Sequence, residues 1–300
     1  MPNRIIELMS DGLKVSTYRG FLHVEKEGNV LANIPFNSIL SIVVTGHQIV
    51  YTDNLLRRLC EENIPLIILG QNYLPVGMLY SFEGHLKQME IQHLQVEQKK
   101  PLYKKLWQVI VQEKIKNQSA VLDFFELENP IKEISKQVLS DDSDNKEGLA
   151  AKLYFKSLFG SKFVRDRDLE GVNSFLNYGY SILRSALARY IVASGLSPSF
   201  GIKHHNKLNP FCLVDDLIEP FRPIVDKLVF QIYVQRKGVY DLTRDDKILF
   251  SSLITAEFKT QKGVSPLYVI LQECVWDLVN SYKKQKVCFK FNPYLIDDEG

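Results

Sequence analysis

The segment from Asn209 to Asp226 spaces charged side chains three and four residues apart among apolar ones. Its charged members are Asp215, Asp216, Glu219, Arg222 and Asp226. On a regular helix, Asp216, Glu219 and Arg222 would share one face, because residues at these spacings are neighbours. Carboxylates packed this densely repel one another unless a cation is present. That cation is either Arg222 alone, in a salt-bridge network, or Arg222 together with a metal ion.

Two prolines, Pro220 and Pro223, interrupt the same segment. Proline removes a helical hydrogen bond and biases the residue before it away from helical angles. We therefore expect a helix to be kinked, or to begin, at Glu219. Such a break would aim the Glu219 carboxylate away from a regular helical face.

A pair of adjacent histidines, His204 and His205, follows Gly201 in a segment punctuated by turn residues. A histidine can ligate a metal through either ring nitrogen. In a loop, one member of such a pair more often coordinates while the other faces solvent or a phosphate. The alternative is that both rings are simply exposed.

Two further places in the second half of the chain could carry function. Glu147 lies three residues after Asp144 where a helix is expected to begin, which is also the spacing of a structural capping box. Near Tyr178 and Arg184, aromatic and basic residues alternate with small ones, which suits stacking on bases and contact with phosphates. Packing of the rings inside a helix bundle is the alternative there.

Glutamate, histidine and a further carboxylate together form an oxygen and nitrogen donor set. Such a set suits Mg²⁺ or Mn²⁺ better than a thiolate zinc site does. Nearby basic side chains suit a phosphodiester substrate, whose charge they would offset. Two basic runs could line a path for nucleic acid, although such runs are also typical of solvated helix faces. They comprise Lys99, Lys100, Lys104 and Lys105, and then Lys283, Lys284 and Lys286.

The first part of the chain, from Arg4 to about Phe82, has the sequence pattern of a β domain. Short runs of Val, Ile, Leu and aromatic residues alternate there with turn residues. Strands are expected at 14–18, 21–26, 30–34, 39–44 and 65–69, with one short helix at 54–63. We predict a β-sandwich-like domain with an inserted helix.

After Gly84 the apolar spacing becomes helical and turn residues become sparse. Helical spacing covers 85–117, with a break or kink at Pro101. Further helices are expected at 119–127, 147–159, 172–194, 211–237, 246–258 and 264–285. The expected fold class is α+β, with an N-terminal β-sandwich-like domain at 1–84, a linker or the start of the first long helix at 85–96, and a larger all-α domain at 97–300.

Composition narrows the classes of function. The net charge of +2 excludes a uniformly basic surface but not a local basic patch. The four cysteines lack the spacing of a zinc site and are expected to be reduced thiols. With no signal peptide and no apolar run of about 20 residues, we expect a cytoplasmic protein without a membrane partner.

At the residues singled out above, the chain resembles the CRISPR-associated integrase, the larger subunit of the spacer-acquisition complex. The residues around Glu219 are similar to the type II subfamily, and the order of the motifs and the two-part texture also match. The resemblance lies in Glu147–Phe155 (EGLAAKLYF), Leu176–Tyr180 (LNYGY), Gly201–His204 (GIKH) and Asp215–Pro223 (DDLIEPFRP).

This resemblance implies an N-terminal β domain, a C-terminal helical domain and a catalytic metal site. Carried over, the catalytic ligands are Glu147, His204 and Glu219. His205 is the second choice, because the histidine pair leaves the register open by one, and Asp216 is a candidate further ligand or supporting group. The expected nucleic-acid contacts are Lys203, His205, Arg222, Arg184 and Tyr178.

The resemblance also implies a reaction and partners. With Mg²⁺ or Mn²⁺, the 3′-hydroxyl of a short DNA duplex would attack a phosphodiester at the edge of a CRISPR repeat. The implied assembly is a homodimer, two of which flank a dimer of a small second Cas subunit in a heterohexamer, with other type II adaptation proteins as further partners. The alternatives are a metal-dependent nuclease acting on branched DNA and a DNA-binding scaffold without catalysis.

Overall fold

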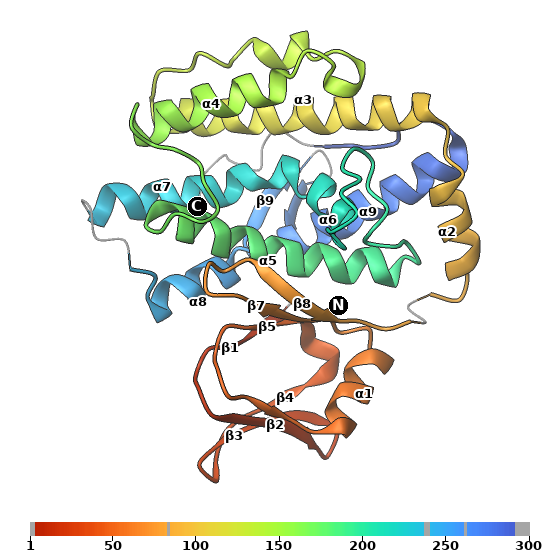
Figure 1. Cartoon of the computed structure of the whole chain (residues 1–300), viewed down its shortest axis with the longest axis vertical. Coiled ribbons are helices and arrows are strands. Elements are labelled where there is room, and N and C mark those ends of the chain that lie inside the picture. The colour runs from red at the N-terminus through yellow and green to blue at the C-terminus, as the bar shows by residue number, and fades with distance from the viewer. Residues whose placement is uncertain (1–3, 83–84, 237–240, 261–262, 292–300) are drawn as a thin grey trace.

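The computed structural model describes residues 4–82, 85–236, 241–260 and 263–291. Figure 1 shows a β-rich part at the bottom and a larger helical part above it, which confirms the predicted fold class. The predicted domain limits stay a prediction. Residues 83–84 lie outside the described residues, and most of the predicted linker is helical because α2 occupies Gln88–Val96.

Two four-stranded sheets form the N-terminal part. The first has the order β1-β5-β7-β8, with the first two pairings parallel and the last antiparallel. The second has the order β4-β3-β2-β6 and is antiparallel except for the β2–β6 pair. The strands are β1 (Arg4–Leu8), β2 (Leu13–Tyr18), β3 (Phe21–Lys26), β4 (Asn29–Pro35), β5 (Ile39–Val44), β6 (Val50–Tyr51), β7 (Leu66–Leu69) and β8 (Pro75–Leu79).

The sheet that contains β5 is covered on both faces. Ile42 and Val44 belong to the core between the two sheets, whereas Val43, which lies between them, belongs to the core of the helical part. Neighbouring side chains on a strand point to opposite faces, so this continuous apolar run serves two cores. The helix α1 (Asp53–Glu61) packs onto the smaller core, and Thr52 caps it by accepting from Leu55 N at 3.4 Å.

Helices in layers build the second part (Figure 1). Figure 1 shows α5 crossing above the sheet that contains β5, β7 and β8, with α3 and α4 on the far side of the helical part. The helices are α2 (Gln88–Val96), α3 (Lys100–Phe124), α4 (Lys146–Phe159), α5 (Val172–Ala193), α6 (Cys212–Leu217), α7 (Arg222–Arg236), α8 (Arg244–Ser252) and α9 (Leu267–Lys284).

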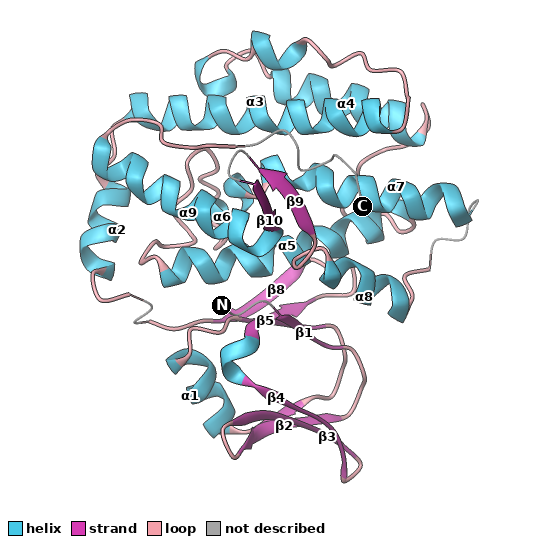
Figure 2. Cartoon of the chain, turned by 180° about the vertical axis from the view of Figure 1, so that it is seen from behind, coloured by secondary structure: helices cyan, strands magenta, loops and turns pink. Residues whose placement is uncertain are grey.

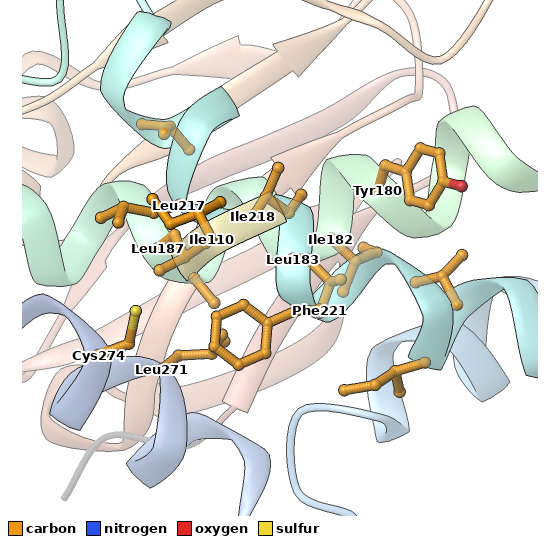
Figure 3. Close-up of a cluster of buried hydrophobic side chains, with 14 of the residues drawn as sticks. Ile110, Tyr180, Ile182, Leu183, Leu187, Leu217, Ile218, Phe221, Leu271 and Cys274 are labelled. Atoms are coloured by element: carbon orange, nitrogen blue, oxygen red, sulfur yellow. The ribbon is translucent and has the colours of Figure 1, made fainter. Parts of the chain in front are cut away.

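The central helix of this part is α5, which is buried along nearly its whole length. A helix that is covered on all sides must pack closely against several neighbours. At Gly179, an added Cβ would lie 2.4 Å from Val225 Cγ1 and 2.9 Å from the Phe250 ring, so α7 and α8 approach the α5 backbone here. Figure 3 shows the adjoining apolar cluster, in which Leu183 of α5 and Leu271 of α9 lie near Phe221.

Several predicted helices differ from those observed. The predicted helix at 119–127 is the end of α3, which runs on from Lys100 with Pro101 in its first turn, where the missing N–H costs nothing. The predicted helix at 246–258 ends at Ser252, and the strands β9 (Glu257–Thr260) and β10 (Gly263–Pro266) form a hairpin before α9 (Figure 2). The helical part is therefore not purely helical, because Glu257–Thr260 and Gly263–Pro266 pair as antiparallel strands. No helix in the described ranges is long and apolar enough to span a bilayer.

Candidate functional site

The carboxylate of Glu147 is available for function because other residues cap its helix. Asn145, with φ of 54°, is the N-cap of α4 and accepts from Gly148 N at 3.2 Å. The Asp142 carboxylate accepts from Lys146 N at 2.8 Å and from Glu147 N at 3.1 Å. The predicted capping box between Asp144 and Glu147 is therefore wrong, since the cap lies one residue further along the chain.

The loop that carries His204 is wrapped around the buried carboxylate of Asp216. Asp216 Oδ2 accepts from Ile202 N at 2.5 Å and from Lys203 N at 2.8 Å. At Gly201, an added Cβ would lie 2.3 Å from the His204 carbonyl oxygen and 2.8 Å from Asp216 Oδ2. Glycine is therefore required at this position, because any side chain would push the loop off the carboxylate.

The imidazole of His204 is oriented by the same carboxylate. His204 Nδ1 lies 2.5 Å from Asp216 Oδ1, and the ring meets the Trp107 ring edge-on at 5.5 Å between centroids. Since a carboxylate accepts, Nδ1 carries the hydrogen in the neutral ring and Nε2 is left as the free lone pair. This hydrogen bond raises the pKa of His204, and burial raises the pKa of Asp216. Asp216 therefore fixes which ring nitrogen of His204 carries the hydrogen when the ring is neutral.

The predicted break at Glu219 is present. The helix α6 ends at Leu217, a 3₁₀ turn spans Glu219–Phe221, and α7 begins at Arg222. Glu219 is buried, and its Oε1 accepts from Arg222 Nε at 2.8 Å. Burial opposes ionisation of Glu219, but Arg222 and Lys114 outweigh it and lower its pKa to about 2.

The cation that joins the two glutamates is Lys114 of α3, which was not among the predicted site residues. Its Nζ lies 2.6 Å from Glu147 Oε1 and 2.5 Å from Glu219 Oε2. Burial lowers the pKa of Lys114, but the two carboxylates overcome this and raise it. Lys114 follows Ile110 by four residues and therefore lies on the apolar face of the helix. A lysine at such a position is the feature of the sequence from which a buried cation could have been predicted.

The histidine pair is divided by the structure. His204 contacts Asp216, whereas His205 is exposed and lies at the rim of a separate surface pocket. Lys203 extends to the loop before α4, where its Nζ lies 2.9 Å from Asp141 Oδ1. The Lys203 contact therefore ties the histidine loop to the segment that leads into α4, the helix that carries Glu147.

Two of the expected nucleic-acid contacts are corrected. Tyr178 is fully buried and donates its hydroxyl hydrogen to Glu7, so its ring cannot stack on a base. Arg184 is also buried, and its Nε donates to Asp215 Oδ1 at 2.8 Å. Its charge is therefore neutralised inside the protein, and packing rather than phosphate contact explains this stretch of α5.

The donor set matches the chemistry of a divalent ion. Glu147 and Glu219 supply oxygen, and Glu219 Oε2 is buried without a properly angled hydrogen bond, although Lys114 lies close to it. His204 donates through one ring nitrogen to a carboxylate, which is the arrangement typical of histidines that bind a metal through the other. Within the described ranges, no three His, Cys, Asp or Glu side chains stand close enough to hold an ion, and Lys114 lies between the two glutamates.

A small cavity of about 220 Å³ opens beside this centre. Lys114, Glu219 and Arg222 line one side, and Arg165, Gln118 and Asp226 contribute to the rest. The guanidinium of Arg222 lies 4.4 Å from the centroid of the Tyr180 ring, which fixes its position above Glu219.

Comparison with protein families identifies one match. The model of the family described as CRISPR associated protein Cas1 matches residues 6–247. A curated relative from Neisseria meningitidis, named CRISPR-associated endonuclease Cas1, is 37% identical over 241 residues, which cover 79% of this chain and 78% of the relative. Another relative with the same kind of name, from Francisella tularensis subsp. novicida, is 28% identical and covers 80% of this chain and 85% of its own length.

Solved structures share the fold at lower sequence identity. A Cas1 protein from Thermotoga maritima has a TM-score of 0.75 at 18% identity, with 96% of this chain and all of that chain (100%) covered. A casposase bound to integration product has a TM-score of 0.79 at 20% identity, with 94% of this chain and 91% of that chain covered. Both share the N-terminal β part and the helical part described above.

Proposed function

Because this chain belongs to the CRISPR-associated Cas1 family, we propose that it is a metal-dependent DNA integrase that inserts short duplexes into a CRISPR array. One observation carries the proposal beyond the family. The side chains of Glu147 and Glu219, from distant segments, meet on a single cation. The Asp216 carboxylate orients His204 with Nε2 free, and the charges of both glutamates act on the His204 ring.

In the proposed site, Glu147, Glu219 and Nε2 of His204 hold the divalent ion. Bound Mg²⁺ or Mn²⁺ would lower the pKa of an attacking hydroxyl and offset the charge that develops on the phosphoryl oxygens. Asp216 keeps the ring of His204 in the tautomer that leaves Nε2 free. Arg222 holds Glu219 ionised and immobile, because its guanidinium is both bonded to Oε1 and stacked on Tyr180.

The proposed reaction is a transesterification. The 3′-oxygen of the incoming duplex forms a new bond to phosphorus at the edge of a repeat. The bond from that phosphorus to the 3′-oxygen of the repeat strand breaks, and the displaced oxygen takes up a proton. Since no covalent bond to the protein forms, the site needs positioning and charge rather than a nucleophilic side chain.

The partners follow from the family and are proposed with the function. Two structural neighbours are Cas6-RT-Cas1–Cas2 complexes, one of them partial, and a third is a complex of Cas1 with DNA. By analogy, this chain would act on double-stranded DNA as a homodimer, and two dimers would flank a dimer of the small second subunit. We place the reaction in the cytoplasm, where the array is copied and read.

A strand-joining assay tests the function. The full chain and its small partner subunit are incubated with a labelled 3′-hydroxyl duplex and a repeat-bearing plasmid in Mg²⁺ or Mn²⁺. We expect a joined product that EDTA abolishes and that Glu147→Gln and Glu219→Gln each reduce at least ~100-fold, as loss of a charge-stabilising group does. Glu133→Gln, which removes an exposed glutamate bonded to Lys136, is the matched control.

The curated relatives are named endonucleases, so hydrolysis is the second candidate. It uses the same residues with water in place of the 3′-hydroxyl as the acceptor. A branched DNA substrate in the same assay separates the two, because hydrolysis shortens strands without joining them. Unchanged joining by either glutamine variant would contradict the assignment of the site.

A further inference from the structure

The lysine between the two glutamates has no role in the site proposed above. Its ammonium nitrogen lies within 2.6 Å of one carboxylate oxygen and 2.5 Å of the other. These are the oxygens that the proposed site would use to hold a divalent ion. An ammonium and a metal ion cannot occupy the same space, and they also repel each other.

We propose that Lys114 is an internal cation that holds Glu147 and Glu219 together in the metal-free protein and must leave them when a divalent ion binds. The inference rests on the proposed function, since it concerns the same site. Lysine suits this task because its charge is a compact ammonium on a flexible four-carbon stem. The side chain is 10% exposed, so water alone does not neutralise the two carboxylates.

The structure also offers the displaced ammonium a second position. Gln118 lies one turn further along α3, on the same face as Lys114, and both side chains line the cavity of about 220 Å³. Gln118 Oε1 is buried and accepts no hydrogen bond from any group that the structure describes. A buried acceptor without a donor is rare in folded proteins, and the displaced ammonium would supply the donor that Gln118 lacks.

Asp226 adds a negative charge to the same cavity. Its Oδ1 accepts the hydroxyl hydrogen of Tyr180, while its Oδ2 lies near the Tyr154 hydroxyl without a properly angled hydrogen bond. Gln118 and Asp226 line this cavity together with Arg165, Arg167 and Arg222, and Glu147 is not among its lining residues. For an ammonium that leaves the two glutamates, Gln118 and Asp226 are the side chains on this lining that can accept from it.

Metal binding by the full chain without DNA tests this exchange. Isothermal titration with Mn²⁺ is carried out on the wild type, on Lys114→Met and on Lys104→Met, which removes an exposed lysine from the same helix. We expect Lys114→Met to bind Mn²⁺ at least tenfold more tightly than the wild type, and Lys104→Met to bind as the wild type does. Equal or weaker binding by Lys114→Met would overturn the inference, because a lysine with a merely structural role would not oppose the metal.

Two further measurements keep the test decisive if Lys114→Met does not fold. In a crystal structure of the wild type with Mn²⁺, we expect Lys114 Nζ on the Gln118 side of the cavity; an ammonium still between the glutamates contradicts the exchange. Gln118→Leu should weaken Mn²⁺ binding several-fold, and unchanged binding would exclude the second position. If Glu147→Gln binds Mn²⁺ as tightly as the wild type, the proposed metal site itself is wrong. This result separates a failure of the proposed site from a failure of the lysine exchange.

Discussion

Tyr178 of α5 donates its hydroxyl hydrogen to Glu7 of β1, so the β part and the helical part share a buried polar contact. The ammonium of Lys247 lies 5.2 Å from the centroid of the Tyr73 ring and 5.6 Å from that of Tyr178. Burial raises the pKa of Glu7 to about 7, although Tyr178 and Lys247 act in the opposite direction. The junction between the two parts is therefore sensitive to pH near neutrality.

This contact predicts a pH-dependent stability. The pKa of Glu7 in the folded protein, about 7, is higher than the ordinary glutamate value of 4.5. The stabilisation that results is fully present below pH 4.5 and is lost as the pH rises through 7. Across that window we expect a loss of about 2–3 kcal/mol from this group. Thermal melts between about pH 5 and pH 8 measure it.

The matched comparison is between the wild type and Glu7→Gln at each pH, because other titrating groups cancel in the difference. The melting temperature of Glu7→Gln relative to the wild type should rise by a few degrees between about pH 5 and pH 8. Glu128→Gln, at an exposed position, should follow the wild-type curve. A difference between Glu7→Gln and the wild type that stays constant with pH would exclude Glu7 as the titrating group.

Asp216→Asn should weaken metal binding without dissolving the fold. The amide would keep the size of the side chain but replace one accepting oxygen with an NH₂ group beside Nδ1 or the loop amides. Loss of a group that orients a metal-binding histidine typically costs about 10- to 100-fold in affinity. Titration with Mn²⁺ checks this, with Asp245→Asn at an exposed site as the control. Wild-type affinity in Asp216→Asn would show that the His204 ring needs no such support.

Gly179→Ala should destabilise the protein by about 1–3 kcal/mol, which is the usual cost of overpacking a core. The new Cβ would lie 2.4 Å from a branched Val225 side chain and 2.9 Å from a buried Phe250 ring, and neither can move freely. This cost outweighs the gain of about 1 kcal/mol that alanine brings to a helix. Urea denaturation measures the difference. In Gly77→Ala, the nearest atom outside its own strand neighbours lies at 4.0 Å, so that control should unfold near the wild-type midpoint.

Removal of divalent metal should leave the fold intact. Lys114 already neutralises Glu147 and Glu219 in the metal-free protein, so their carboxylates are not left buried beside each other without a cation. The far-ultraviolet circular dichroism spectrum in EDTA should match the spectrum in Mn²⁺. The melting temperature should be higher in Mn²⁺ only by the amount that metal binding to the folded state contributes. An unfolded chain in EDTA would contradict this, because it would make the ion a structural one.

The sequence determined the features that depend on neighbours along the chain. Alternation and turn residues identified β2, β3, β4, β5 and β7 but missed β1, β6 and β8, and helical spacing identified α4, α5 and α9. Pro220 and Pro223 predicted the break at Glu219, because proline acts on its own backbone. Local patterns failed at 257–258 and 264–266, where the paired strands β9 and β10 replace the ends of two predicted helices, since strand pairing is decided by two short segments together.

Only the tertiary structure decided which of the candidate residues meet. Glu147, Glu219 and Lys114 lie in three different helices or turns, and no spacing in the sequence shows that one ammonium contacts both carboxylates. The same holds for Asp216, which supports His204 across a loop, and for Tyr178, which the β part buries. The sequence shows which side chains are able to do chemistry. Their partners depend on how distant segments pack, because ion pairs and burial are set by distances in space and not by spacing along the chain.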